Sequence, residues 1–480
     1  MAPGPTAGRR VAAVLGGALA AGALAPPAAH AHGLVQRADL PIPEWLFGWG
    51  AAIVLVVSFA ALAVLWPRPR LERVTCRPLP GGRLLAGLPV QIATGALGVA
   101  LLVVVVWAGY AGPEGSQANL APTFLLVIVW VGLVFASALF GDVFRAVNPW
   151  RAIGRSAGWL ATRARGGRPL SHLPYPERLG RWPAAAALLA FTWIELASGW
   201  GESPGTLVSA VLAYSALTLA GMAVYGTETW ARNAEGFGVY FNLFSRLSVF
   251  ETRDRQLGVR PLLSGLPQLD PRPGTVAVVA VMIGTVTFDG LSQGALWRSV
   301  SVEINDALAS LGFSLERTPM LTSTIGLLLG VGLVAGFYAL GISGARSVGG
   351  DLGVERLRRG FVHSLVPIAM VYVAAHYLTY LLFQGQAIAY LASDPVGRGW
   401  DLFGTASSAI DYSVISQNGT WYAQVAFVVA GHVAALVLAH DRALTLYSHA
   451  QTAVRSQYWM LGVMVGFTTL ALWLLAQANA

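Results

Sequence analysis

The chain has 480 residues, of which 55% are hydrophobic and only 11% are charged, whereas a typical soluble domain has about 25% charged residues. This composition excludes a soluble globular protein and predicts a polytopic membrane protein. The formal net charge of +8 does not indicate a nucleic-acid partner, because all 31 basic residues are arginines and none falls inside an apolar run.

The first 31 residues have the pattern of a secretory signal peptide. Arg9 and Arg10 precede a short apolar stretch at 11–24, and residues 29–31 (Ala-His-Ala) form a small-x-small cleavage site. Cleavage there would make His32 the mature N-terminus, outside the cytoplasm. An N-terminal histidine can chelate copper through its amine and imidazole, so a copper site at His32 is one hypothesis, and an arbitrary residue after the cleavage site is the other.

Ten apolar runs, most of them about the 20 residues that a membrane-spanning helix needs, follow the signal. They are 44–66, 84–110, 121–141, 182–200, 205–225, 275–297, 319–342, 361–383, 421–440 and 458–477. The predicted fold class is therefore all-α, with residues 32–480 forming a single transmembrane helix bundle of about ten spans whose first partner is the lipid bilayer.

Arginine placement predicts the orientation of this bundle. If His32 lies outside, five loops are cytoplasmic, and they carry 25 of the 31 arginines. These loops are 67–83, 142–181, 226–274, 343–360 and 441–457. Cytoplasmic loops of membrane proteins are enriched in basic residues. The pattern predicts a multi-pass protein of the cell membrane, with both mature termini outside.

The longest cytoplasmic loop, 226–274, contains an aromatic stretch from Gly236 to Phe250 (GFGVYFNLFSRLSVF). We expect an interfacial or re-entrant helix here. The segments 141–153 and 441–454 resemble it and also follow inward-going spans. A repeat of span, amphipathic segment and span is one interpretation; chance similarity among membrane-edge segments is the other.

Two acids and two histidines lie well inside the apolar runs, away from their ends: Glu195, Asp289, His376 and His432. An ionisable group in hydrocarbon costs about 2.5–3.5 kcal/mol or more, and such groups usually mark functional sites. At about 1.5 Å of helix rise per residue, the first three lie at nearly one depth. His432 lies near the midplane.

A shared layer of this kind is what a metal site requires, because imidazole and carboxylate together suit Zn, Fe or Cu. A metal with an open position would make bound water a nucleophile. Glu195 and Asp289 are then the candidate catalytic residues, and all four are candidate metal ligands. Hydroxyls and amides that could orient the ligands are Thr192, Thr287, Ser292, Tyr377, Tyr380 and Gln384.

Other hypotheses use the same residues. His376 and His432 could ligate one haem b. Each ionisable group could instead be paired locally within the bundle, or the cluster could form a proton or ion pathway. No P-loop, dinucleotide-binding or serine-hydrolase motif is present in the sequence.

Three segments resemble a known group of proteins: HGLVQRADLPIPEWLFGWGAAIVLVVSFAALAVLW at 32–66, FGDVFRAVNPWRAIG at 140–154 and GHVAALVLAHDRAL at 431–444. The group consists of actinobacterial polytopic membrane proteins labelled fenitrothion hydrolase. The resemblance implies a membrane-associated hydrolase of organophosphate triesters, which are small lipophilic substrates, and it supplies no catalytic residues.

The leading prediction is a metal-assisted phosphotriester hydrolase. The alternative is a non-enzymatic transporter, or a metal- or haem-handling protein, that uses the same four residues to bind a proton or ion.

Overall fold

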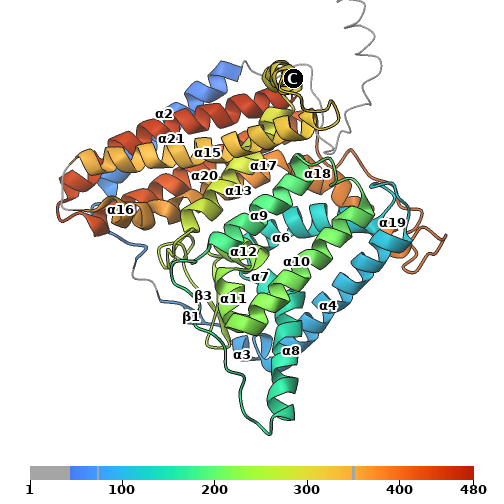
Figure 1. Cartoon of the computed structure of the whole chain (residues 1–480). Coiled ribbons are helices and arrows are strands. Elements are labelled where there is room, and N and C mark those ends of the chain that lie inside the picture. Colours follow the sequence, from blue (N-terminus) through green and yellow to red (C-terminus); the bar gives the residue numbers. More distant parts are fainter. Residues whose placement is uncertain (1–43, 73–74, 349–351, 480) are drawn as a thin grey trace, which may run out of the picture. The chain divides into compact units, whose positions relative to one another are not determined.

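A computed structural model describes residues 44–72, 75–348 and 352–479, all within one compact unit. The predicted signal peptide and His32 lie outside the described residues. The unit is mostly helical, with one small sheet (Figure 1). This confirms the predicted fold class at the level of a helical bundle.

Within the described ranges, seven helical segments are long and apolar enough to cross a membrane. They are Gly48–Leu65 within α2 (Glu44–Leu65); Gly82–Ala111, with α3 (Gly82–Leu85) and α4 (Leu88–Ala111); Leu120–Phe140, with α5 (Leu120–Pro122), the π-helix η1 (Thr123–Gly132) and α6 (Leu133–Phe140); α10 (Pro204–Tyr225); α13 (Thr275–Ser292); α15 (Thr318–Ser347); and α20 (Gln417–Leu446). The chain is therefore a multi-pass membrane protein.

Every one of the ten predicted runs contains helix. A bent pair, Val354–His376 and Leu378–Ser393, makes an eighth candidate span. The run at 182–200 forms only the 15-residue α9 (Trp182–Leu196), about 22 Å long at 1.5 Å per residue. The last run lies within α21 (Ala450–Asn479). Helix at all ten runs is thus observed, and the number of spans stays a prediction.

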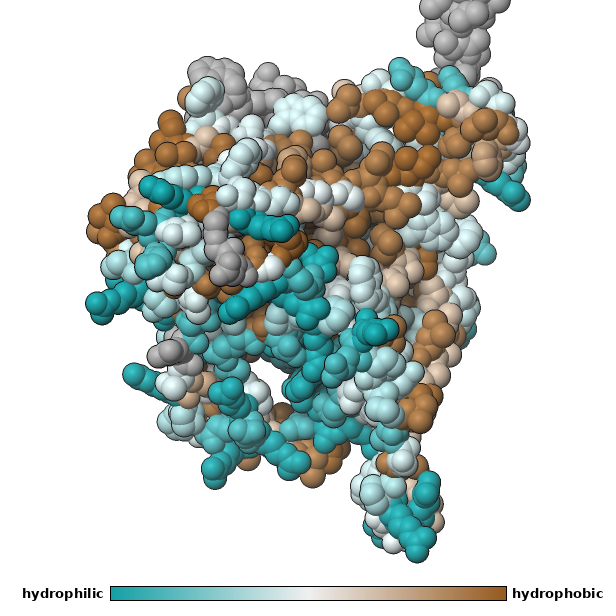
Figure 2. All heavy atoms as spheres, turned by 60° about the vertical axis from the view of Figure 1, so that its left-hand side comes forward, coloured by the Kyte–Doolittle hydropathy of each residue, from teal (hydrophilic) through white to brown (hydrophobic). Residues whose placement is uncertain are grey.

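Side chains on the outside of the helices fit a lipid environment. On α15, for example, Leu328, Leu329 and Leu340 are 52%, 63% and 60% exposed. Figure 2 shows hydrophobic residues gathered over one part of the surface and hydrophilic residues over another. This separation is expected when one zone faces hydrocarbon and another faces water.

Local signals explain where several helices begin. Ser416 precedes α20, and its hydroxyl accepts a hydrogen bond from the Gly419 amide at 3.0 Å. Asn148 caps α8 (Pro149–Ala164) by accepting from the Arg151 amide at 2.9 Å, and Pro149 occupies the first turn. Both are preferred arrangements at a helix start, because they satisfy amides that have no partner inside the helix.

The eighth candidate span is interrupted repeatedly. It comprises α16 (Val354–Phe361), the 3₁₀ segment η2 (Val362–Leu365), α17 (Val366–His376), α18 (Leu378–Phe383), the 3₁₀ segment η3 (Gln384–Ala387) and α19 (Ile388–Ser393). The two halves meet at Tyr377 with a bend of 59°. The π-helix η1 packs against α18 and η3, so two irregular helices lie side by side. Broken and π-helical segments within membranes often mark functional sites.

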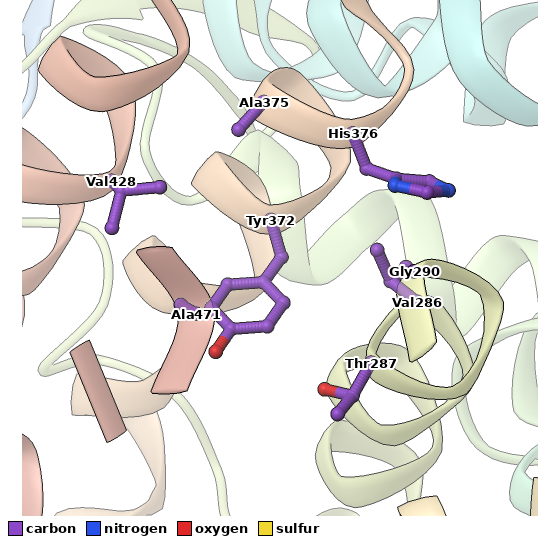
Figure 3. Close-up of a pocket in the computed structure, with 8 residues that line it drawn as sticks. All are labelled: Val286, Thr287, Gly290, Tyr372, Ala375, His376, Val428 and Ala471. Carbon is purple, nitrogen blue, oxygen red and sulfur yellow. The ribbon is translucent and has the colours of Figure 1, made fainter. Parts of the chain in front are cut away.

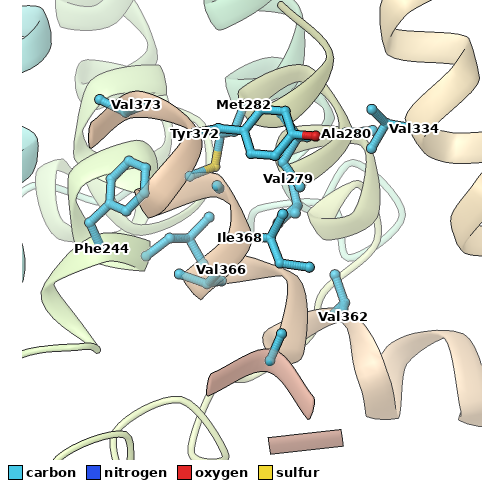
Figure 4. Packing of buried hydrophobic residues seen from close by; sticks show 14 of the residues in the cluster. Phe244, Val279, Ala280, Met282, Val334, Val362, Val366, Ile368, Tyr372 and Val373 are labelled. Carbon is cyan, nitrogen blue, oxygen red and sulfur yellow. The ribbon is translucent and has the colours of Figure 1, made fainter. Parts of the chain in front are cut away.

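Helix α13 is the central element of the bundle, since 78% of its residues are buried. It packs against α9, α15, α17 and α21. A Cβ added at Gly284 would lie 2.5 Å from the Cα of Val331 on α15. The glycine therefore permits a backbone contact between the two helices that a side chain would block. Figure 4 shows residues of the surrounding apolar cluster, among them Met282 of α13 and Tyr372 of α17.

A small antiparallel sheet, which the all-α prediction did not include, joins two loops. Its strands are β1 (Arg77–Pro78), β2 (Phe250–Arg253) and β3 (Gln256–Val259), in the order β1-β3-β2. The β2–β3 turn places Asp254 and Arg255 at φ 49° and 59°, as a two-residue hairpin turn with both central residues left-handed requires. Strands of two to four residues are too short to show alternation in the sequence.

Several helices lie wholly or mostly between the predicted runs, among them α7 (Val143–Val147), α8, α11 (Thr227–Asn233), α12 (Gly236–Ser245) and α14 (Ala295–Ser310). The predicted interfacial stretch at 236–250 contains α12. Most of this helix is buried, and it packs against α6, α7 and α9. Tyr240 of α12 stacks on Trp130 of η1, with ring centroids 4.5 Å apart. The aromatic content of this stretch therefore serves core packing.

Candidate functional site

Asp289 lies within the buried core of α13 and is 1% exposed. Its Oδ2 atom accepts a hydrogen bond from the Tyr377 hydroxyl at 2.7 Å and another from Nε2 of His376 at 2.9 Å. His376 and Tyr377 are themselves 7% and 2% exposed. The structure thus joins two of the four ionisable residues singled out in the sequence, with Tyr377 as a third partner.

The helix break brings these two neighbours to one carboxylate. In a continuous helix, consecutive side chains point about 100° apart. Here α17 ends at His376, and Tyr377 has the non-helical dihedrals φ −99° and ψ 13°. A carbonyl near the break also finds a partner, because the Gln424 side chain donates to the Ala375 oxygen at 2.8 Å. The break and the site are therefore one feature.

Glu195 lies on another helix that packs against α13. It lies in the last turn of α9, which packs against α13. Its Oε2 atom is buried and has no hydrogen-bond partner among the described residues. Glu195 lies within electrostatic range of Asp289, so the two predicted carboxylates belong to one region of the bundle.

His432 lies in α20 and is fully buried. Its Nδ1 donates to the Val428 carbonyl at 2.7 Å, and its Nε2 has no partner within the described part of the chain. The ring lies 6.4 Å from that of Tyr372, centroid to centroid. The described contacts of His432 thus lead to Tyr372 on α17, one turn before His376.

Among the described residues, no three His, Cys, Asp or Glu side chains form a group that could hold a metal ion. Asp289 and His376 are paired and Glu195 is near, whereas His432 contacts Val428 and Tyr372. The four-ligand metal centre therefore stays a prediction.

A small cavity opens beside His376. It is lined by Val286, Thr287, Gly290, Tyr372, Ala375, His376, Val428 and Ala471, which come from α13, α17, α20 and α21 (Figure 3). Its volume is about 40 Å³, enough for a few water molecules. Sites for drug-sized ligands and cofactors occupy about 300–1,000 Å³. This cavity suits water rather than a haem or a triester.

Four of the five hydroxyls that were expected to orient ligands make hydrogen bonds of two kinds. Tyr377 donates to Asp289, as described above. Thr192, Thr287 and Ser292 instead donate to carbonyls of their own helices, at 3.0, 2.9 and 2.7 Å. Such back-bonding satisfies a hydroxyl locally, so Tyr377 is the hydroxyl for which the structure gives a direct bond to the carboxylate.

Asp441 is a buried acid that the sequence interpretation missed. It is 0% exposed, and its two oxygens accept from the Trp66 indole at 2.8 Å, the Arg70 amide at 2.6 Å and the Leu71 amide at 3.1 Å. It therefore fastens the chain after α2 to α20. The predicted span ended at residue 440, which left Asp441 outside the membrane, whereas α20 continues to Leu446.

Glu235, also fully buried, has a similar structural role. It caps α12 by accepting from the amides of Phe237 and Gly238 at 2.9 and 2.8 Å. The hydroxyl of Tyr214 and the amide of Asn148 donate to the same carboxylate, at 2.5 and 2.9 Å. Burial raises the pKa of Glu235, to about 7. Four donors to one carboxylate make this a helix cap that ties three segments together.

No protein-family model matches the chain, and neither a curated protein nor a solved structure matches it.

Proposed function

We propose that this chain is a cell-membrane protein that moves protons through the cluster of Asp289, His376 and Tyr377, with Glu195 as a second carboxylate. The observation that carries the proposal is the hydrogen-bonded Asp–His–Tyr cluster, buried at a break in a membrane helix. Ionisable groups at such positions typically mark proton relays and ion pathways. This is the transporter hypothesis that the sequence left open.

The chemistry of the cluster suits a proton. Imidazole exchanges its proton near neutral pH, and a carboxylate bonded to it can stabilise the cation that forms. The Oδ2 atom of Asp289 already accepts bonds from two donors, Tyr377 and His376. A divalent ion such as Mg²⁺ or Ca²⁺ would instead require about six or more oxygen ligands. The arrangement therefore favours a proton over such ions.

The elements that carry the cluster also suit transport. Substrate and ion sites of many transporters lie near the bilayer midplane, where discontinuous helices end. Here Asp289, His376 and Glu195 lie on α13, α17 and α9, and two of these helices end next to the residue concerned. A change in the position of α9 or α17 would alter the distance between the groups.

Proton flux in liposomes tests this function. Purified protein would be reconstituted with a pH-sensitive dye inside, and a potential would be applied with potassium and valinomycin. We expect Asp289→Asn and His376→Phe each to reduce flux by about tenfold or more. The exposed acid Glu303 supplies a matched control, Glu303→Gln, with flux unchanged. Flux of Asp289→Asn equal to that of the unchanged protein would refute the proposal.

A hydrolase remains the second candidate, because the Asp289–His376 pair stands beside a cavity that fits water. A histidine oriented by a carboxylate can act as a general base toward water. A divalent metal held by these residues, as the sequence suggested, would make that water more acidic. Turnover of a fenitrothion-type triester by purified protein, lost in His376→Ala and accompanied by stoichiometric Zn, Fe or Cu, would support this candidate over proton transport.

A further inference from the structure

Tyr372, which lines the cavity beside His376, and its neighbour His432 each have a buried polar atom with no hydrogen-bond partner among the described residues. One is the hydroxyl of Tyr372, a residue that lines the cavity and is 6% exposed. The other is Nε2 of His432, whose ring centroid lies 6.4 Å from that of Tyr372. Tyr372 precedes His376 by about one turn of α17, whereas Tyr377 follows His376 at the end of that helix.

A buried polar group without a hydrogen bond costs about 1–3 kcal/mol. Proteins usually avoid this cost by placing ordered water at such groups. The cavity meets the requirements for water, since it holds about 40 Å³ and is bordered by His376, Tyr372 and Thr287. Water there would give the Tyr372 hydroxyl and the His432 nitrogen the partners that the side chains around them do not provide.

We infer that water in this cavity joins His376 to His432 through the Tyr372 hydroxyl and forms a proton branch from the central cluster. The inference rests on the proposed function and extends it to residues outside that cluster. The branch runs along the seam where α17 packs against α20. Its direction is toward the arginine-bearing ends of these helices, near Arg358 and Arg442, which the arginine distribution predicts to be cytoplasmic.

The tautomer of His432 allows it to accept a proton from water. Its Nδ1 proton is held by the Val428 carbonyl, so Nε2 is the nitrogen with a free lone pair. A water that donates a proton to Nε2 turns His432 into an imidazolium, and that water is restored by a proton from a His376 imidazolium, which becomes neutral. The His432 imidazolium then passes the proton from Nε2 to the next water, so that one proton has moved from His376 to that water and His432 is neutral again.

His363 extends the same seam. It lies in η2, which packs against α20, and it is 2% exposed. Its Nδ1 bonds the Gly360 carbonyl at 2.9 Å, and its Nε2 has no partner in the described ranges. His432 and His363 thus repeat one arrangement, with one nitrogen fixed by a carbonyl and the other open.

The branch is tested with His432→Phe and Tyr372→Phe in the liposome flux assay. We expect each to lower flux by about tenfold, with an unfolding midpoint close to that of the unchanged protein. The matched control is Tyr447→Phe, which removes a buried hydroxyl whose partner is the Ala345 carbonyl. Flux in this control should be unchanged.

Two results would overturn the branch and leave the central site standing. One is normal flux in both His432→Phe and Tyr372→Phe while Asp289→Asn abolishes it. The other is an experimental density map, at a resolution that shows water, with none within hydrogen-bonding distance of the Tyr372 hydroxyl and His432 Nε2. The density result is independent of flux. If the unchanged protein carried no protons, the proposed function would fail, and so would the branch as a proton route.

Discussion

Removal of the Asp289 carboxylate should reveal how much of the fold depends on the central cluster. Asp289→Ala leaves the Tyr377 hydroxyl and the His376 Nε2–H without their acceptor. Polar interactions between membrane helices contribute about 0.6–1.7 kcal/mol each, so the loss of two predicts about 1–3 kcal/mol. Asp289→Asn should cost less than about 1 kcal/mol, because its amide oxygen can occupy the place of Oδ2 and accept both bonds.

The free energy of unfolding in mixed micelles, followed by circular dichroism during a titration with denaturing detergent, measures these differences. Tyr377→Phe removes one donor and should cost about half as much as Asp289→Ala. In the double variant the two losses should not add, because they break the same bond. Equal destabilisation by Asn and Ala, or full additivity with Tyr377→Phe, would show that these hydrogen bonds do not hold the cluster together.

Three further changes test the packing around the site and in two other parts of the bundle. Gly284→Ala should lower the free energy of unfolding by about 1–3 kcal/mol, because its Cβ would lie 2.5 Å from the Cα of Val331. The control is Gly332→Ala, which should be nearly neutral in the same unfolding assay, because a Cβ there would meet nothing within 4 Å. Asp441→Ala removes the acceptor of three hydrogen bonds and should cost about 2–4 kcal/mol; faster proteolysis after α2 is the expected readout, and unchanged proteolysis would contradict the fastening role. Glu235→Gln turns an amide group toward donors and should cost about 1–3 kcal/mol. The cost of Glu235→Gln should shrink as pH rises from about 4.5 toward 7, because the raised pKa of Glu235 makes the unchanged protein lose stability over that range; a cost that grows with pH would contradict this.

The helical bundle could be predicted from the sequence because the thickness of the bilayer sets the length of each apolar run. It also predicted that Asp289 and His376 share a depth, since helix rise converts residue number into height. The structure adds what the depth of a residue in the membrane does not reveal, namely which helix faces contact one another. Asp289 bonds His376 at 2.9 Å, whereas the described contacts of His432, placed near the same depth, lead to Val428 and Tyr372.

The break at Tyr377 had no local signal. The stretch from 368 to 383 is apolar and contains neither proline nor glycine, the usual causes of a sharp kink. Only the tertiary contacts of His376 and Tyr377 with Asp289, together with the Gln424 bond to Ala375, show where the helix ends. The end of α9 was missed for a related reason, because the apolar run continues past Leu196 although α9 stops there.

The interruption at Tyr377 lies where a hinge between α17 and α18 would be expected. The backbone at a break is not held in a continuous ladder of hydrogen bonds, so α18 can tilt against α17 while both helices stay intact. Because His376 is the last residue of α17 and Tyr377 lies at the break, any such tilt would change the orientation of their side chains toward Asp289. A tilt of α18 would thus change the hydrogen bonds that Asp289 accepts, and it would link movement of this helix to the proposed proton site.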